Sequence, residues 1–247
     1  MPVYFKIVKK MSDNGKIRLI EEYNNILADK DVPEVIQLLS EKHPGRVGFS
    51  TSLGLEDQVL TQIIATTVPD IFIFTLDTGR LFQETYDLLD ITQKRYKIPI
   101  KVFFPDHHSL EEMVNTKGIN LFFESVENRK LCCHIRKIEP LRRALVNVDV
   151  WISGLRKDQS VTRKKSKLVE WDNTHQKIKV NPLIDWSLDD VLDYIKKYNI
   201  PYNPLHDQGY PSIGCLPCTR AIEPGEDIRA GRWWWEHPAH KECGLHK

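Results

Sequence analysis

The sequence predicts an α/β protein with an open, mostly parallel sheet, helices on both faces and a loop-rich C-terminal segment. From residue 46 onward, short apolar runs alternate with segments of helical periodicity, as in proteins with a parallel sheet. The runs are rich in β-branched and aromatic residues and are apolar on both faces, which is typical of strands buried inside such a sheet. The chain has 247 residues, of which 41% are hydrophobic, so it can bury a core of the required size.

The first 45 residues predict helices in front of the sheet. Apolar residues recur at helical spacing at Ile17, Ile20, Tyr23 and Leu27, and a second such pattern covers residues 35–39. We therefore expect two amphipathic helices there. The chain accordingly divides into an N-terminal helical segment (1–45), an α/β domain (46–220) and a mobile C-terminal tail (221–247).

Four strands and three helices make up the predicted sheet region. The strands are expected at residues 46–50, 71–76, 100–104 and 149–153. The helices that follow the first three strands are expected at residues 56–65, 81–96 and 109–115.

The last third of the chain adds a hairpin, one helix and a tail. Two strand-like stretches flank Asn173-Thr174-His175, which predicts a hairpin at an edge of the sheet or outside it. Ser187 is a good N-cap, and the helix that it opens must stop before Pro201. Six prolines in the last 47 residues disfavour a long regular helix in the tail.

Composition excludes several classes of protein. The net charge of +1 argues against a general polyanion binder, so we expect no nucleic acid partner. No apolar run approaches the ~20 residues that a membrane span needs, and charged residues interrupt the N-terminal stretch that a signal peptide would occupy. We therefore expect a cytoplasmic protein without a membrane partner.

Two strand-to-helix turns predict an anion site. The first turn, residues 50–57, reads STSLGLED and presents hydroxyls and backbone N–H groups at a helix N-terminus, where an anion is favoured. It lacks the three spaced glycines of a dinucleotide fingerprint and the Gly-Lys-Ser/Thr of a Walker loop. The alternative to an anion site is a plain polar turn with an N-cap. The second turn, Leu76-Asp77-Thr78-Gly79-Arg80, falls at the same carboxyl edge of the sheet, which favours a ligand site.

Four of the five cysteines form two pairs. Cys132 and Cys133 are adjacent, and Cys215 and Cys218 form a CxxC motif. This pattern suggests a four-cysteine metal site, in which the adjacent pair fits zinc poorly and fits an iron–sulfur cluster better. Buried inert thiols and a redox CxxC are the alternatives. A disulfide framework is not expected in a reducing compartment.

The fifth cysteine, Cys243, is a candidate nucleophile. It lies near the end of the sequence, between Lys241 and His246, and cationic neighbours lower the pKa of a thiol. A terminal thiol without a function is the alternative.

Positive charge is concentrated in two segments despite the neutral total. Residues 129–143 and 156–167 each carry a net charge of +5, and Gly154-Leu155-Arg156 directly follows a predicted strand. Solvated faces or RNA-contacting patches are the common explanations, but a position beside strand ends and Cys132 favours a small polyanionic ligand. Arg229 and Arg232 precede the candidate nucleophile, and the three tryptophans after Arg232 are expected in the core or an interface.

Seven stretches, covering the chain from about residue 44 onward, together resemble the iron–sulfur branch of the APS/PAPS reductase family, the assimilatory adenylyl-sulfate (APS) reductases. The stretches are STSLGLED, LDTGRL, CCHIRKIEPL, the GLRKDQS…TR region, GCLPCT, GEDIRAGRWWWE and ECGLH. The resemblance implies an adenine nucleotide α-hydrolase-like fold, one 4Fe–4S cluster per chain and an active-site cysteine. The implied cluster ligands are Cys132, Cys133, Cys215 and Cys218. The implied catalytic residues are Cys243 and His246.

The resemblance also implies a substrate site. To the residues that the resemblance matches we add those of the second turn and of the segment after the fourth strand. The full set of predicted substrate-binding residues is Ser50, Ser52, Gly54, Glu56, Asp57, Leu76, Asp77, Thr78, Arg80, Lys137, Gly154, Arg156, Arg163, Arg229 and Arg232. Here the chain reads QSVTRKKSK where family members often carry a longer loop, so the choice among Arg163, Lys164 and Lys165 stays open.

The implied activity is the reduction of adenosine 5′-phosphosulfate to sulfite and AMP in assimilatory sulfate reduction, on the route to cysteine. The thiolate of Cys243 would attack the substrate sulfur and form an S-sulfonate, which thioredoxin or glutaredoxin would reduce. The implied partners are this nucleotide, the thiol reductant and further copies of the chain in a homo-oligomer.

Three other functions remain open on the sequence. The first is a PAPS reductase, which prefers the 3′-phosphorylated form of the nucleotide, or an enzyme that accepts both this form and adenosine 5′-phosphosulfate. An ATP pyrophosphatase would need the paired glycines that STSLGLED lacks. A zinc-stabilised RNA-binding module would be colourless and would bind RNA in a salt-sensitive way, whereas an iron–sulfur protein is brown.

Overall fold

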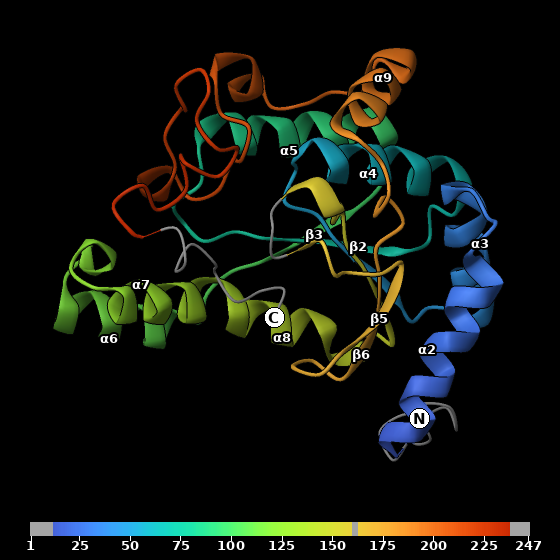
Figure 1. The fold of residues 1–247 in the computed structure, drawn as a ribbon. Coiled ribbons are helices and arrows are strands. Elements are labelled where there is room, and N and C mark those ends of the chain that lie inside the picture. Colours follow the sequence, from blue (N-terminus) through green and yellow to red (C-terminus); the bar gives the residue numbers. More distant parts are fainter. Residues whose placement is uncertain (1–11, 160–162, 238–247) are drawn as a thin grey trace. The chain divides into compact units, whose positions relative to one another are not determined.

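The computed structural model describes residues 12–159 and 163–237. Its six-stranded sheet has the order β3-β2-β1-β4-β6-β5. The strands are β1 (Val47–Ser50), β2 (Phe72–Leu76), β3 (Ile100–Phe103), β4 (Val150–Ile152), β5 (Val169–Asp172) and β6 (Lys177–Val180). β4 pairs in parallel with β1 and β6, and β5 runs antiparallel to β6 at the edge (Figure 1). The predicted α/β fold with a mostly parallel sheet is confirmed, and the expected hairpin forms one edge of that sheet.

The chain divides into two compact units. The first comprises Met1–Thr51, Glu56–Ile73 and Asn147–Ile200, and the second comprises Ser52–Leu55, Phe74–Val146 and Pro201–Lys247. Because each unit is assembled from separate stretches of sequence, residues far apart in the chain meet within it. The division into an N-terminal segment, an α/β domain and a mobile tail stays a prediction.

The first unit contains the N-terminal helices that the sequence predicts. They are α2 (Asp13–Leu27) and α3 (Val32–Lys42). The apolar stripe of α3 is buried, and its start is fixed by a capping box in which Asp31 and Glu34 satisfy each other's backbone N–H groups. The side chain of Asn24 in α2 donates to the backbone oxygen of Val169, which ties the helix to β5 (Figure 1).

Two further helices of the first unit follow predicted signals. They are α4 (Leu55–Thr67), of which Leu55 itself belongs to the second unit, and α9 (Leu188–Tyr198). In α9, Ser187 forms the expected N-cap as part of a capping box with Asp190. The helix ends at Tyr198, and its C-cap Asn199 adopts a left-handed conformation before Pro201.

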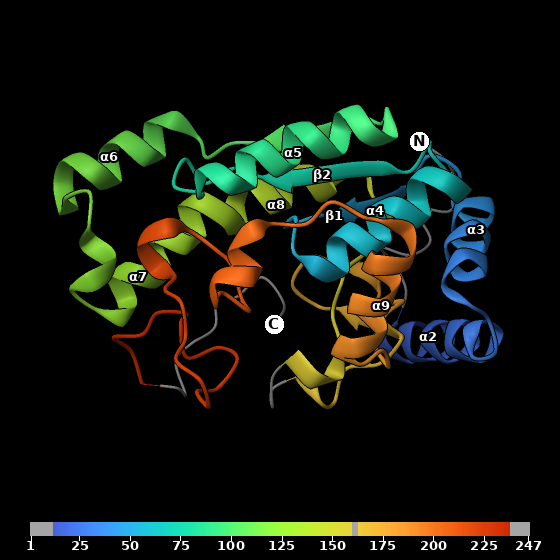
Figure 2. The same cartoon turned by 90° about the horizontal axis from the view of Figure 1, so that it is seen from above.

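The second unit contains two predicted helices and a further helical stretch that was not predicted. The expected ones are α5 (Gln83–Tyr96) and α6 (His107–Lys117). The others form a continuous helical stretch, namely α7 (Val126–Cys133), a π-helical turn (His134–Ile138) and α8 (Glu139–Ala144). Residues 201–237 follow an irregular path with short 3₁₀ turns and a β-bridge between Thr219 and Arg232 (Figure 2). Near the end of this path, Glu236 is hydrogen-bonded to Arg129 of α7.

No helix within the described ranges is long and apolar enough to cross a membrane.

Candidate functional site

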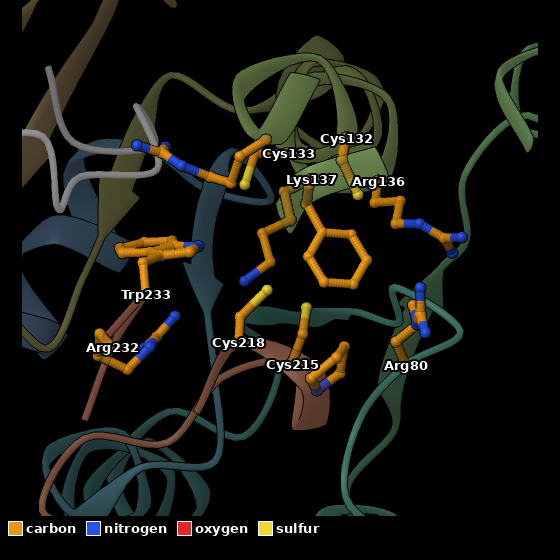
Figure 3. A pocket seen from close by; sticks show the side chains of 12 residues that line it. Arg80, Cys132, Cys133, Arg136, Lys137, Cys215, Cys218, Arg232 and Trp233 are labelled. Carbon is orange, nitrogen blue, oxygen red and sulfur yellow. The ribbon is translucent and has the colours of Figure 1, made fainter. Parts of the chain in front are cut away.

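Four cysteine thiols line a single cavity in the second unit. Cys132 and Cys133 come from the end of α7, and Cys215 and Cys218 come from the segment around the 3₁₀ turn Leu216–Cys218. All four side chains are buried, and none of these four cysteines forms a disulfide (Figure 3). The structure therefore brings together the four residues that the sequence singles out as cluster ligands, although 81 residues separate the two pairs in the chain.

A break in helix geometry follows the adjacent cysteines. In a regular α-helix neighbouring side chains point about 100° apart, because there are 3.6 residues per turn. At Cys132 and Cys133 the helix passes directly into the π-helical turn His134–Ile138. Such wide turns are rare and are frequently found at functional sites. The turn also places Arg136 and Lys137 on the wall of the cavity.

The CxxC segment is held by backbone hydrogen bonds. The Leu216 N–H donates to the carbonyl oxygen of Arg80 at 2.8 Å, and the Trp233 N–H donates to that of Cys218 at 3.1 Å. The thiol of Cys215 lies 3.3 Å from the hydroxyl of Thr78. The cysteines are therefore fixed to the turn after β2 and to the segment that leads to the C-terminus, and not held by apolar packing alone.

Positive charge surrounds the thiols. The cavity wall includes five cationic side chains, namely Arg80, Arg129, Arg136, Lys137 and Arg232. Figure 3 shows the amine of Lys137 pointing into the cavity. Burial by itself would raise the pKa of Cys215, but the charge of Lys137 and the hydroxyl of Thr78 outweigh it, so this pKa is lowered. Burial raises the pKa of Cys218 to about 12, and the neighbouring thiols add to this effect.

Arg129, one of these cations, forms a buried ion pair. Arg129 donates two hydrogen bonds to Glu236, at 2.9 and 2.7 Å, and both side chains are almost completely buried. Two guanidinium groups lie over the ring of Trp233, that of Arg129 at 4.8 Å and that of Arg232 at 4.7 Å from its centre. The pair joins α7, which carries Cys132 and Cys133, to the segment that precedes residue 238.

The residues around the cavity fit an iron–sulfur cluster. Four thiols are the donor set that such a cluster uses, and the cations offset the negative charge of a thiolate-bound cluster. The indole N–H of Trp233 is buried without a hydrogen-bond partner among the described residues, and it points toward the cysteines (Figure 3). A cluster sulfur is an acceptor that would satisfy this donor. Within the described residues, no group of three or more His, Cys, Asp or Glu side chains is arranged to hold one metal ion.

The turn after β2 contacts the cysteine cavity more closely than the sequence suggests. Asp77 accepts hydrogen bonds from the Gly79 N–H at 2.7 Å and from the hydroxyl of Tyr86 at 2.8 Å, and Gly79 has the positive φ of 69° that favours glycine. Thr78, beside Cys215, also accepts a hydrogen bond from Arg136 through its backbone oxygen at 2.5 Å. The side chain of Arg80 donates to the loop after α6, at the backbone oxygen of Ile119.

The first unit holds a second group of predicted site residues. Ser50 ends β1, Glu56 and Asp57 lie in the first turn of α4, and Gly154 and Arg156 follow β4. The guanidinium of Arg156 donates to Glu56 at 2.8 Å and is buried, so its charge is balanced inside the protein. The structure thus brings the ends of two adjacent parallel strands together, as expected for a ligand site at the carboxyl edge of a sheet.

Gln159 organises the segment after β4. Its side-chain oxygen accepts hydrogen bonds from the backbone N–H of Arg156, at 3.2 Å, and from the guanidinium of Arg163. Arg163 is half-buried, whereas Lys164 and Lys165 are exposed. Among these three cations, Arg163 is therefore the one that the structure ties to the predicted site. Gln159 is not among the predicted site residues, because a glutamine in a basic run carries no signal of its own.

The remaining predicted residues lie elsewhere. Leu76 ends β2, Lys137 and Arg232 line the cysteine cavity, and Arg229 is half-buried, with its backbone N–H donating to Asp227. In the turn before α4, the Ser52 hydroxyl accepts a hydrogen bond from the Gly54 N–H at 3.4 Å. Cys243 and His246 lie outside the described residues.

We predict that Gly154→Ala will destabilise the first unit and weaken its ligand binding. A Cβ at this position would lie 2.2 Å from Oδ1 of Asp57 and 3.2 Å from Cβ of Glu56, so both predicted site residues must move. Overpacking of this kind costs about 1–3 kcal/mol, to be measured by urea denaturation, and nucleotide affinity should fall with it. An unchanged unfolding midpoint together with unchanged affinity would show that the close approach is not needed.

Comparisons with known proteins agree on one family. The model of the phosphoadenosine phosphosulfate reductase domain matches residues 46–221. The adenosine 5′-phosphosulfate reductase of Allochromatium vinosum is 50% identical over 214 residues, which cover 86% of this chain and 84% of that protein. The protein of the same name from Neisseria meningitidis serogroup B is 50% identical over 200 residues, 81% of each chain.

Solved structures agree in fold. The phosphoadenylyl-sulfate reductase of Candida auris, in a phosphate complex, is similar with a TM-score of 0.72 and 28% identity, covering 86% of this chain and 98% of that one. The FMN adenylyltransferase of Candida glabrata has a TM-score of 0.54 at 13% identity, covering 97% and 83%, and shares the fold alone.

Proposed function

The chain belongs to the phosphoadenosine phosphosulfate reductase family and, within it, to the adenosine 5′-phosphosulfate reductases, and on this basis we propose the reaction that it catalyses. The enzyme reduces adenosine 5′-phosphosulfate to sulfite and AMP with electrons from thioredoxin. The intermediate is an S-sulfonate on Cys243. As a member of this family the chain is an oxidoreductase that acts on sulfur, so the RNA-binding module is set aside.

The first half of the proposed reaction is a nucleophilic displacement at sulfur. The thiolate of Cys243 attacks the sulfur of the sulfate group, a bond forms between the two sulfur atoms, and the bond from that sulfur to the phosphate oxygen breaks. AMP leaves with the electron pair of the broken bond. Lys241 and His246 are close to Cys243 in the sequence, and a positive charge on either favours the thiolate.

The second half is thiol–disulfide exchange. A thiolate of thioredoxin attacks Sγ of Cys243, which expels sulfite and leaves a mixed disulfide. The second thiol of thioredoxin resolves this disulfide, so that Cys243 regains its thiol and thioredoxin is oxidised. The two electrons that convert the sulfate sulfur to sulfite therefore come from thioredoxin.

The described residues supply charge for these steps. In the first unit, Ser50, the first turn of α4 from Glu56 onward and Arg163 offer donors to a phosphate or sulfate oxygen. In the second unit, Lys137 and Arg232 carry positive charge beside the cysteines. Such groups reduce the repulsion between a thiolate and an anionic substrate and stabilise the charge that develops on the departing phosphate.

The four-cysteine cavity would hold a 4Fe–4S cluster through Cys132, Cys133, Cys215 and Cys218. When bound, the cluster supplies a fixed local charge and holds the two cysteine segments together. Around it, the hydroxyl of Thr78 contacts Cys215 of the CxxC segment, and Arg136 holds Thr78 by donating to its backbone oxygen. The convergence of these four thiols in a chain that is half identical to named adenosine 5′-phosphosulfate reductases is the observation that carries the proposal.

The decisive experiment separates the two halves of the reaction. Anaerobically purified protein is incubated with adenosine 5′-phosphosulfate without a reductant, and we expect release of AMP and one sulfonate mass on the Cys243 peptide. Addition of reduced thioredoxin should then release sulfite. Faster labelling by the 3′-phosphorylated nucleotide would identify a PAPS reductase. A modification at another residue, or pyrophosphate release from ATP, would contradict the proposal.

A further inference from the structure

The hydroxyl of Ser50 accepts a hydrogen bond from a buried tryptophan. The indole nitrogen Nε1 of Trp151 lies 2.8 Å from Oγ of Ser50. An indole N–H can only donate, so the Ser50 oxygen must be the acceptor in this bond. The proton of the hydroxyl is therefore left to be donated to a different group.

The position of Trp151 is set by the sheet. It lies in β4, opposite Gly48 in the parallel pairing with β1, so Ser50, two residues further along β1, is its diagonal neighbour. The side chain is almost fully buried, at 1% exposure. The ring of His175 packs edge-on against it, with centroids 5.4 Å apart.

The amine of Lys179 further restricts the indole, because it lies 5.5 Å from the ring centre. Lys179 is itself paired with Glu170 of β5 at 3.0 Å. Residues of the β5–β6 hairpin thus pack against the indole and favour its observed orientation. Ser50 is half-buried at the end of β1, where the first turn of the predicted anion site begins.

We infer that Trp151 is a positioning residue that holds the Ser50 hydroxyl as a hydrogen-bond donor for the anionic part of the nucleotide. Phosphate and sulfate oxygens only accept hydrogen bonds, so a serine whose oxygen already accepts one presents to them the proton that they need. The inference rests on the proposed function, because it requires an anionic nucleotide at the end of β1. It adds a residue of β4 that does not touch the ligand but decides how a ligand-binding residue is presented.

The test is a double-mutant cycle read by AMP affinity. Isothermal titration calorimetry with AMP is carried out on the wild type, Trp151→Phe, Ser50→Ala and the double variant, with thermal unfolding of each as a check on folding. Loss of one hydrogen bond corresponds to roughly 2- to 10-fold weaker binding for Trp151→Phe. In the Ser50→Ala background the same change should have no further effect, because the residue through which it acts is gone.

Trp171→Phe is the matched control. Trp171 belongs to β5 in the same unit, and its indole nitrogen has no hydrogen-bond partner among the described residues. This control should leave AMP affinity unchanged. Equal losses from Trp151→Phe with and without Ser50, or no loss at all, would overturn the inference.

A second measurement does not depend on the folding of Trp151→Phe. In the ¹⁵N spectrum of tryptophan-labelled protein, the indole signal of Trp151 should shift when AMP is added to the wild type and should not shift in Ser50→Ala. The same response in both proteins would overturn the inference. Wild-type protein that binds neither AMP nor adenosine 5′-phosphosulfate would refute the proposed function itself, and the inference with it.

Discussion

Replacing Cys243 with serine is expected to abolish sulfite formation from adenosine 5′-phosphosulfate. A serine hydroxyl is a far weaker nucleophile than a thiolate at neutral pH and cannot form the S-sulfonate that thioredoxin reduces. The four remaining cysteines are those that line the cavity of the second unit. Sulfite release with saturating thioredoxin, measured on Cys243→Ser and on the wild type side by side, gives the result.

Two properties that Cys243 should not affect, AMP affinity and visible absorption, are the controls for this variant. AMP affinity and the visible absorption of the protein should match the wild type, because neither Ser50 and its neighbours nor the four cavity cysteines are changed. Retention of wild-type turnover would show that another residue is the nucleophile. Loss of colour together with turnover would place Cys243 among the residues that hold the cluster, and would contradict the division of the cysteines into four and one.

The second large effect is expected from Glu236→Ala in the second unit. The substitution leaves the guanidinium of Arg129 buried without its carboxylate, and breaking a buried ion pair in this way costs about 3–5 kcal/mol. Chemical denaturation of the anaerobically purified protein should show a large fall in the unfolding midpoint. Replacing both partners together, as in Arg129→Met with Glu236→Leu, should cost less, because no charge is left unpaired.

Asp90→Ala is a matched control in the same unit. Asp90 forms an ion pair with Lys94, but both side chains are more than half exposed, and such pairs are worth about 0.3–0.5 kcal/mol. The denaturation midpoint should therefore barely move. If Glu236→Ala shifted the midpoint as little as Asp90→Ala, the Arg129–Glu236 pair would not be what anchors the segment before residue 238 to α7.

The strands and most helices followed from local patterns. Apolar runs predict β1 to β4 within one or two residues of their observed ends, and Ser187 and Pro201 bracket α9 as expected. The helical stretch from α7 to α8 was not predicted. Its sequence, VENRKLCCHIRKIEPL, mixes charged and apolar residues without a clear stripe, because both cysteines and several cations face a cavity and not an apolar core.

The charged residues could be counted from the sequence, but the partner of each charge could not be identified. Arg129, Arg136 and Arg143 look alike in the basic run of residues 129–143. In the structure Arg129 is neutralised by Glu236, 107 residues away, Arg136 donates to the backbone oxygen of Thr78, and Arg143 pairs with Glu139 on its own helix. Of these three contacts, only the Arg143–Glu139 pair joins residues close enough in the sequence to be inferred from their spacing.

By itself the sequence determined the class of fold, the grouping of four cysteines apart from a fifth, and the family, because strand periodicity, cysteine spacing and short motifs are local properties of the chain. The tertiary structure decided which cations are already paired, that Thr78 lies against Cys215, and that Trp151 donates to Ser50. These contacts join residues about 100 or more positions apart. Their partners are chosen by the packing of sheet and helices, and no local pattern encodes that choice.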